Sequence, residues 1–240
     1  MNAVTNNPSR IILTKIHSIS KGGFAKMQTI PTERYDPSNK RIRLLYELRW
    51  RLFPLLRRMY SVGEKTEISF RAIIRDPRHI SIGYGSRIGF GAELWTFGSH
   101  PEGGKYSIVC EDFSDIRPYA LLHAYGGWIH VGKRSCINSF SIVNGMGGVR
   151  FGDNVMMGTG CNFISAEHEF EDRDTPMSFQ ECHLSPIWVE DDVYIGAGST
   201  LLAGVHVHAG AVIGAGSVVR HDVPSGAVTA GVPAKVIRMR

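Results

Sequence analysis

The sequence from residue 189 to residue 223 repeats every six residues. A branched aliphatic residue occupies position one of each hexad, at Val189, Ile195, Leu201, Val207, Ile213 and Val219. An amphipathic helix repeats near 3.6 residues and a strand alternates with period two, so neither template produces this spacing. The repeat therefore predicts a unit that consists of one short strand and one turn.

Two further positions of the hexad indicate how these units are arranged. Position five is always small or β-branched, and position four holds Asp192, Gly198, Gly204, Gly210, Gly216 and Asp222. Glycine and aspartate tolerate a left-handed backbone, so we expect a bend at position four. Three bends close a triangular coil, and stacked coils share a core made of positions one and five. The predicted fold class is an all-β solenoid.

The repeat also gives the boundaries of this solenoid. Weaker hexads begin near Ile82, and the six-residue step slips by two residues at the sequence NGMGG before it resumes at Phe151. We expect an N-terminal extension over 1–67, the solenoid domain over 68–230 and a basic C-terminal tail over 231–240. Two segments, at about 95–113 and 164–186, interrupt the period, and the second is expected to protrude as a loop.

The N-terminal extension contains a basic stretch at residues 40–58, KRIRLLYELRWRLFPLLRR, with seven basic residues against Glu47. Its leucines and isoleucine fall on one helical stripe, which predicts a basic amphipathic helix that Pro54 ends or kinks. Such a helix can lie on an anionic membrane surface. It can also pack on the solenoid or on a sister subunit, and we favour packing.

Composition favours a cytoplasmic protein, with contact at the inner face of the membrane only through 40–58. The N-terminus has no signal-peptide pattern, and no apolar run reaches the roughly 18 residues of a membrane span. The net charge of +5 is concentrated partly in the basic stretch, and no nucleic-acid partner is expected. The four cysteines are widely separated without a CxxC pair, which favours free thiols over a zinc site.

The second interruption, ISAEHEFEDRDTPMSFQECHLSP, is the strongest candidate for a functional segment. Long excursions from a regular array are usually functional or disordered. The segment holds His168 among acidic residues. A histidine exchanges a proton near neutral pH, and a neighbouring carboxylate can fix its tautomer. The alternative is a surface histidine in a solvated acidic loop.

The hexads, followed by AGVPAKVIR at 230–238, resemble the hexapeptide-repeat acyltransferases over about residues 68–240. The motif SAEHEFEDRDTP, followed by Q and then by SPIWVEDDVYIGAG, is similar to the sugar and polysaccharide O-acetyltransferases, including the maltose and galactoside branch. This resemblance implies a left-handed parallel β-helix. It also implies acetyl-CoA as donor, a saccharide acceptor, no metal, and a homotrimer with active sites between subunits.

The resemblance also implies roles for individual residues. His168 corresponds to the base that activates the acceptor hydroxyl, and Asn138, thirty residues earlier, corresponds to an asparagine that binds the acceptor. The thirty-residue spacing places these two side chains at different corners of the prism, so two subunits are expected to form one site. The residues implied in CoA binding are Ala197, Ala215, Gly216, Arg220, Lys235 and Arg238. Arg220 and His221 replace a Thr-Lys pair that is common in the galactoside branch.

Several alternatives remain open from the sequence. We expect direct transfer in a ternary complex, because no cysteine or serine lies in a nucleophile motif. Transfer to an amino group of a nucleotide-linked sugar is the second interpretation, and a non-enzymatic or metal-binding solenoid is the third. His206 and His208 hint at a metal pair, because γ-class carbonic anhydrases bind zinc on this fold, but exposed residues are favoured. The side chains that could line an acceptor groove are Trp95, His100, His123 and Tyr125.

Overall fold

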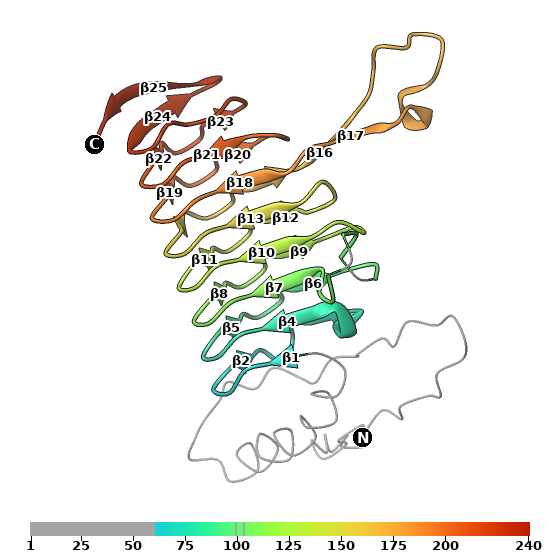
Figure 1. Cartoon of the computed structure of the whole chain (residues 1–240), viewed down its shortest axis with the longest axis vertical. Helices are drawn as coiled ribbons and strands as arrows, with labels where there is room; N and C mark the ends of the chain where they lie inside the picture. The colour runs from blue at the N-terminus through green and yellow to red at the C-terminus, as the bar shows by residue number, and fades with distance from the viewer. Residues whose placement is uncertain (1–60, 99, 103) are drawn as a thin grey trace, which may run out of the picture. The chain divides into compact units, whose positions relative to one another are not determined.

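A computed structural model describes residues 61–98, 100–102 and 104–240 of the chain. These residues form stacked coils with almost no helix (Figure 1). Two 3-10 turns, η1 (Pro77–His79) and η2 (Met177–Phe179), interrupt the strands. None of the described segments is a helix of the length and apolarity required to span a bilayer. The predicted extension and its amphipathic helix at 40–58 lie outside the described residues.

Three faces of short parallel strands surround the core. The first face consists of β1 (Ser61–Val62), β4 (Ile80–Ile82), β7 (Ile108–Cys110), β10 (Ile129–Val131), β13 (Val149–Phe151), β18 (Ile187–Val189) and β21 (His206–Val207). The second face consists of β2 (Glu67–Ile68), β5 (Arg87–Ile88), β8 (Asp115–Ile116) and β11 (Cys136–Ile137), then β14 (Met156–Met157), β19 (Tyr194–Ile195), β22 (Val212–Ile213), β24 (Ala227–Gly231) and β25 (Ala234–Met239). The third face consists of β3 (Ile73–Arg75), β6 (Glu93–Trp95), β9 (Leu121–His123), β12 (Ile142–Asn144), β15 (Asn162–Ile164), β20 (Thr200–Leu201) and β23 (Val218–Val219). The architecture is the expected left-handed parallel β-helix.

The pairing registers explain where the sequence repeat slips. Trp188 pairs with His206, 18 residues later, as three uninterrupted hexads require. Ile129 pairs with Val149, 20 residues later. The two additional residues lie at the corner between the third and first faces, within the NGMGG sequence. Extra length is therefore added at a corner, and the strand pairing on the faces continues without a break.

The core consists of the residues at positions one and five of each hexad, as the repeat predicts. The position-one side chains of Ile195, Leu201 and Ile213 are fully buried. Ser199, at position five, is also fully buried, and its hydroxyl donates to the carbonyl oxygens of Gly196 (2.8 Å) and Gly214 (3.0 Å). A buried hydroxyl that is hydrogen-bonded in this way does not destabilise the core. The serines at position five thus connect successive coils.

The bends at position four are also largely as predicted. Asp192, Gly198, Gly204, Gly210 and Gly216 have φ values between 55° and 81°. Asp222 does not have a positive φ, and its carboxylate instead accepts the backbone N–H of His206 at 2.9 Å. Left-handed backbone at these positions turns the chain from one face to the next.

The ends of the solenoid differ in detail from the expected boundaries. β1 already pairs with β4 at Ser61, so the first described coil begins before residue 68. At the other end, the basic segment expected as a tail contains β25, which pairs antiparallel with β24. This hairpin covers the last edge of the second face, where an open edge would expose unpaired backbone groups.

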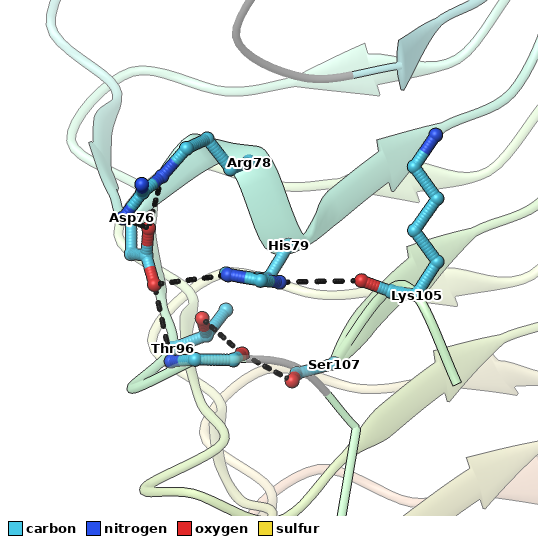
Figure 2. Close-up of polar contacts among 7 residues, drawn as sticks. Asp76, Arg78, His79, Thr96, Lys105 and Ser107 are labelled. Atoms are coloured by element: carbon cyan, nitrogen blue, oxygen red, sulfur yellow. Dashed lines mark hydrogen bonds and ion pairs between the residues drawn. The ribbon is translucent and has the colours of Figure 1, made fainter. Parts of the chain in front are cut away.

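The first insertion, between β6 and β7, is tied to the preceding coil by polar contacts (Figure 2). One carboxylate oxygen of Asp76 accepts the N–H of Gly98 at 3.0 Å and lies 3.7 Å from His79 Nε2. His79 Nδ1 lies 3.2 Å from the carbonyl oxygen of Lys105, and the Ser107 hydroxyl donates to the carbonyl of Gly98 at 2.7 Å. The Asp76–His79 pair therefore anchors the base of the insertion.

Two neighbouring glycines test how closely the coils approach one another. A Cβ on Gly196 would lie 2.6 Å from the Ala215 Cα, whereas a Cβ on Gly198 would meet no atom within 4 Å. Gly196→Ala is expected to lower the free energy of unfolding by about 3 kcal/mol because the coils must separate. Gly198→Ala is expected to cost about 1 kcal/mol, since only its left-handed backbone is strained. Urea unfolding measures both, and equal losses would contradict this packing.

Candidate functional site

The second insertion leaves the third face after β15 and presents His168 on a hairpin (Figure 1). β16 (Ala166–His168) pairs antiparallel with β17 (Cys182–Leu184), which places His168 opposite Cys182. The Cys182 Sγ lies 3.4 Å from His168 Nδ1 and 3.8 Å from Nε2, and the histidine is exposed. Among the described residues His168 contacts a thiol and no carboxylate. The acidic neighbours in the sequence therefore do not orient its ring.

Hydrogen bonds of Gln180 and Asp172 stabilise the loop itself. Gln180 donates from Nε2 to the carbonyl oxygens of Asp172 and Thr175, each at 2.7 Å. Hydrogen bonds from the Thr175 side chain and from the Asp174 backbone lower the pKa of the Asp172 carboxyl below its usual range. Apolar side chains project from the same loop: Phe170, Met177 and Phe179 are 65%, 65% and 80% exposed. The loop is thus an ordered projection that presents both a titratable and an apolar surface.

Small residues form a ladder at the corner between the second and third faces. We define the small-residue ladder as the segments 158–160, 196–198 and 214–216, which read GTG, GAG and GAG. The N–H of Gly198 donates to the Thr159 carbonyl (2.9 Å) and the N–H of Gly216 to the Ala197 carbonyl (2.8 Å). Gly160, Gly198 and Gly216 have no atom within 4 Å of the place where a side chain would begin. The predicted CoA contacts Ala197, Ala215 and Gly216 all lie on this open strip of backbone.

Asn138 lies at the same corner, one coil before the ladder. Its Nδ2 donates to the Met157 carbonyl at 3.0 Å, and its Oδ1 accepts the N–H of Ser139 at 2.8 Å. One N–H and one lone pair of the amide remain available for another partner. Next to Asn138, Phe140 occupies the left-handed position and stacks on Tyr119 at 5.4 Å. Asn138 therefore stabilises the corner with half of its hydrogen-bonding capacity.

His168 and Asn138 lie at opposite ends of the third face, as their spacing predicts. Five residue steps along the chain, from Gly160 through β15 to Ser165, separate the two corners, a span of at most about 17 Å. The imidazole and the small-residue ladder of one chain are therefore not brought together by the regular part of the coil.

The three basic candidates occupy different places, and all are exposed. Lys235 pairs with Ala230 in the C-terminal hairpin, and a Cβ on Gly214 would lie 2.7 Å from the Ala230 Cβ. Lys235 thus lies at the end of the small-residue ladder. Arg238 pairs with Val228, further along β24, and Arg220 follows β23 at the far end of the third face. Only Lys235 shares the corner of the ladder.

An aromatic cluster lies at the loop end of the third face. Trp95, His123, Asn144 and Ile164 are successive partners across the ladder of strands, so they form one row that leads to the base of the His168 loop. The His123 ring packs edge-on against Trp95 with centroids 5.2 Å apart. Tyr125 lies nearby, with its hydroxyl 3.0 Å from His123 Nδ1. His100 is not part of this cluster, because it stacks on Trp128 at 5.6 Å.

His123 is only 8% exposed, and its surroundings favour the uncharged ring. Burial lowers the pKa of His123 below 6.5 and Arg75 acts in the same direction, while the hydrogen bond to Glu93 at 3.2 Å opposes the shift. The guanidinium of Arg75 lies 4.3 Å from the centre of the Trp95 ring. Trp95 Nε1 is buried without a hydrogen-bond partner.

Three of the cysteines are unsuited to nucleophilic chemistry. Burial raises the pKa of Cys110 to about 12, and burial also raises the pKa of Cys136 and of Cys161. A buried thiol of raised pKa forms little thiolate and is inert. Cys182 differs from these three because it contacts His168.

Sequence reasoning missed three neighbours of its candidate histidines: Cys182 beside His168, Glu93 beside His123, and Glu190 beside His206 and His208. Glu190 could have been found, because it lies one 18-residue coil before His208. Nothing in the repeat predicts Cys182, since its position depends on the antiparallel pairing within the loop.

Comparison with known proteins agrees with this architecture. Residues 186–221 match the family model described as bacterial transferase hexapeptide (six repeats). The chain is 36% identical over 116 residues to a putative acetyltransferase of Schizosaccharomyces pombe, covering 48% of this chain and 54% of the relative. It is 57% identical over 54 residues to a 2,3,4,5-tetrahydropyridine-2,6-dicarboxylate N-acetyltransferase of Staphylococcus aureus, covering 22% of this chain and 23% of that one. The chain thus spans about half the length of the first relative and about a quarter of the second.

Solved structures show the same fold. AntD, an N-acyltransferase from Bacillus cereus solved with dTDP and 3-hydroxybutyryl-CoA, superposes with a TM-score of 0.51 at 22% identity over 78% of this chain and 87% of AntD. The fold and the corner glycines define a left-handed β-helix of triangular coils. Residues 186–221 of this chain thus carry the repeat that the bacterial transferase hexapeptide model describes.

The lowered pKa of His123 predicts a dependence of stability on pH. Below pH 6.5 the unfolded chain takes up a proton that folded His123 resists, so the free energy of unfolding falls as the pH falls. His123→Gln removes this contribution. Its loss of stability between about pH 7.5 and about pH 5.5 should be smaller than that of the wild type, by up to about 1.4 kcal/mol per pH unit.

Urea unfolding at each pH gives these free energies. His221→Gln is the matched control, because His221 is exposed at a corner, and it should follow the wild type. Identical pH profiles for His123→Gln and the wild type would show that His123 is not held neutral.

Proposed function

We propose that this chain is an acyltransferase that moves an acetyl group from acetyl-CoA to a hydroxyl of a saccharide. One observation carries the proposal: the longest interval between paired strands of the first face, 38 residues from Val149 to its partner Ile187, presents His168 on a paired hairpin. A regular coil needs no such projection to fold. The relatives described as acetyltransferases and the fold shared with AntD support acyl transfer.

The small-residue ladder is the proposed binding strip for acetyl-CoA. Without side chains at Gly160, Gly198 and Gly216, a long ligand can lie against the backbone and use its peptide groups. Lys235, at the end of the ladder, is available to pair with a phosphate of the nucleotide. AntD was solved with an acyl-CoA, which supports the same class of donor for this chain. Arg220 and Arg238 lie away from the ladder and have no assigned contact in this proposal.

His168 is the proposed general base. The acceptor hydroxyl gives its proton to the imidazole while its oxygen attacks the thioester carbon. The tetrahedral intermediate then collapses, the carbon–sulfur bond breaks, and the departing sulfur takes the proton from the imidazolium. Cys182 contacts the imidazole from the opposite strand of the hairpin. The acyl group passes directly to the acceptor, and the raised pKa values of Cys110, Cys136 and Cys161 support a mechanism without a thiol intermediate at those positions.

Two chains are proposed to complete each site. The imidazole of one chain and its own ladder are separated by the width of the third face, at most about 17 Å. A homotrimer with cyclic symmetry can place the loop of one chain over the ladder of the next. The exposed side chains of Phe170, Met177 and Phe179 offer an apolar surface for such a contact.

The acceptor is proposed to approach from the aromatic cluster of Trp95, His123 and Tyr125. This cluster lies on the row that leads to the base of the loop. Aromatic faces suit sugar rings, and the guanidinium of Arg75 lies over the Trp95 ring.

Transfer to an amino group is the second candidate function. It is favoured by the descriptions of the Staphylococcus aureus relative and of AntD, both of which transfer acyl groups to nitrogen. The two products differ chemically: alkaline hydroxylamine cleaves an ester and leaves an amide intact. Treatment of the radiolabelled product with hydroxylamine therefore distinguishes the two acceptors.

The role of His168 predicts the behaviour of a variant. His168→Ala should reduce acetyl-CoA consumption in the presence of a saccharide acceptor by about 100-fold or more, because the attacking hydroxyl loses its base. CoA binding, measured by calorimetry, should be unchanged, since the ladder lies at another corner.

Cys182→Ala is the matched control on the opposite strand of the hairpin. Direct transfer predicts that this variant keeps most of its activity and forms no acyl-protein. Full activity in His168→Ala would refute the proposed base, and an acyl group trapped on Cys182 would refute direct transfer.

The shared site predicts complementation between two inactive variants. His168→Ala removes the base, and Ala215→Trp covers the ladder at an exposed position. If each site takes its base from one chain and its ladder from the next, every mixed trimer contains one intact site, so activity should recover to about one third of the wild type. Co-expression with two affinity tags isolates the mixed assembly. No recovery in mixed trimers, or a fully active monomer by sedimentation, would contradict the shared site.

A further inference from the structure

Glu190, His206 and His208 gather on the outer side of the first face, in a cluster that acyl transfer does not use. His206 and His208 flank the inward-facing Val207, so both project outward from the end of β21. Glu190 follows β18, which pairs with β21. Within the part of the chain that the structure describes, this is the one group of three such side chains whose ligand atoms lie close enough to share an ion.

The distances within the cluster suit a small divalent cation. Glu190 Oε1 lies 2.8 Å from His206 Nε2 and 3.2 Å from His208 Nδ1, and all three ligand atoms lie within 4.8 Å of one another. Tetrahedral zinc with bonds of about 2.0–2.1 Å needs ligand atoms about 3.4 Å apart. Small rotations of the partly exposed side chains are sufficient to open the carboxylate–imidazole contacts to this spacing.

Other contacts hold the carboxylate and the histidine strand in place. The backbone N–H of Ala209 donates to Glu190 Oε2 at 2.9 Å, which leaves Oε1 directed at the two imidazoles. The N–H of His206 donates to Asp222 at 2.9 Å. Secondary contacts that orient the ligands are a regular feature of metal sites and strengthen them.

A second His–Glu pair on the first face has one histidine fewer than the cluster of Glu190, His206 and His208. His130 Nε2 lies 3.2 Å from Glu111 Oε1, in the same diagonal arrangement as His206 and Glu190. The position that corresponds to His208 is Gly132 in that coil. A histidine–carboxylate hydrogen bond therefore needs only one histidine. The second histidine, with its ring centroid 4.0 Å from that of His206, supplies a third ligand atom to the same point.

We infer that Glu190, His206 and His208 form a site for Zn²⁺, with a fourth coordination position open to solvent. Two imidazoles and one carboxylate are a ligand set that zinc prefers, and three protein ligands leave one position for water or a bound molecule. A shallow depression beside the cluster, lined by Arg150, Trp188 and Asp191, gives access to this position. The site is independent of the proposed acyl transfer, because it lies on a different face from both His168 and the ladder.

The experiment titrates Zn²⁺ into chelator-treated protein against a chromophoric competitor. The wild type is expected to bind one ion per chain and to gain thermal stability with added zinc, because the ion binds the folded state. Co²⁺ should give the visible absorption of a tetrahedral site. Glu190→Gln and His208→Ala should each weaken zinc binding by at least about 100-fold and abolish the cobalt spectrum, since each removes a direct ligand.

His130→Ala is the matched control, because it removes a histidine from the same face and leaves the cluster intact; it should bind zinc as the wild type does. A His168→Ala protein controls for zinc held by the His168–Cys182 pair and should also bind normally. Circular dichroism confirms that each variant is folded. The inference is overturned if the wild type binds no zinc, or if binding survives in Glu190→Gln and His208→Ala.

Discussion

The bend at the fourth position of each hexad is the constraint on which the rest of the structure depends. The backbone there is left-handed in nearly every coil, and where glycine occupies the position no side chain projects from the corner. The bends fix three faces, and the faces fix which side chains enter the core. Every length irregularity is placed at the corner between the third and first faces, where the NGMGG slip and both insertions lie. The other two corners stay tight.

As a result, the candidate functional groups lie at different corners of the coils. One corner carries all the long loops, including the His168 hairpin and the insertion anchored by Asp76. A second corner carries the exposed backbone of the small-residue ladder. The width of one face separates these corners, which is why the proposed reaction, which uses both, is assigned to two neighbouring chains. The outer side of the first face carries the Glu190–His206–His208 cluster, which depends only on the register of two neighbouring strands.

Much of the fold could be predicted because each hexad repeats the same short strand followed by the same bend. The six-residue period predicts the coils. The apolar position of each hexad predicts the core, and the position of glycine or aspartate predicts the corners. The repeat also assigns residues to corners, which is why the separation of Asn138 and His168 and the common corner of Ala197 and Ala215 follow from counting. The same counting relates Glu190 to His208.

The rest depends on contacts that no period describes. The pairing of β16 with β17 brings Cys182 to His168, and the Asp172 carboxylate accepts the backbone N–H of Asp174 within the loop instead of contacting the histidine. The side-chain amide of Asn138 forms two of its hydrogen bonds with backbone groups of its own corner. Arg220 is near the ladder in sequence but follows β23 at the far end of the third face, and Arg238 pairs with Val228, two residues before the Ala230 that lies at the ladder.

A crystal structure of the protein with acetyl-CoA tests the account most directly. The account predicts the pantetheine chain along Ala197 and Ala215, with the thioester carbonyl facing His168 of a neighbouring chain across a gap that admits one acceptor oxygen, about 3 Å from the imidazole. A cofactor bound away from this corner, or an imidazole that faces bulk solvent far from every thioester, would contradict it.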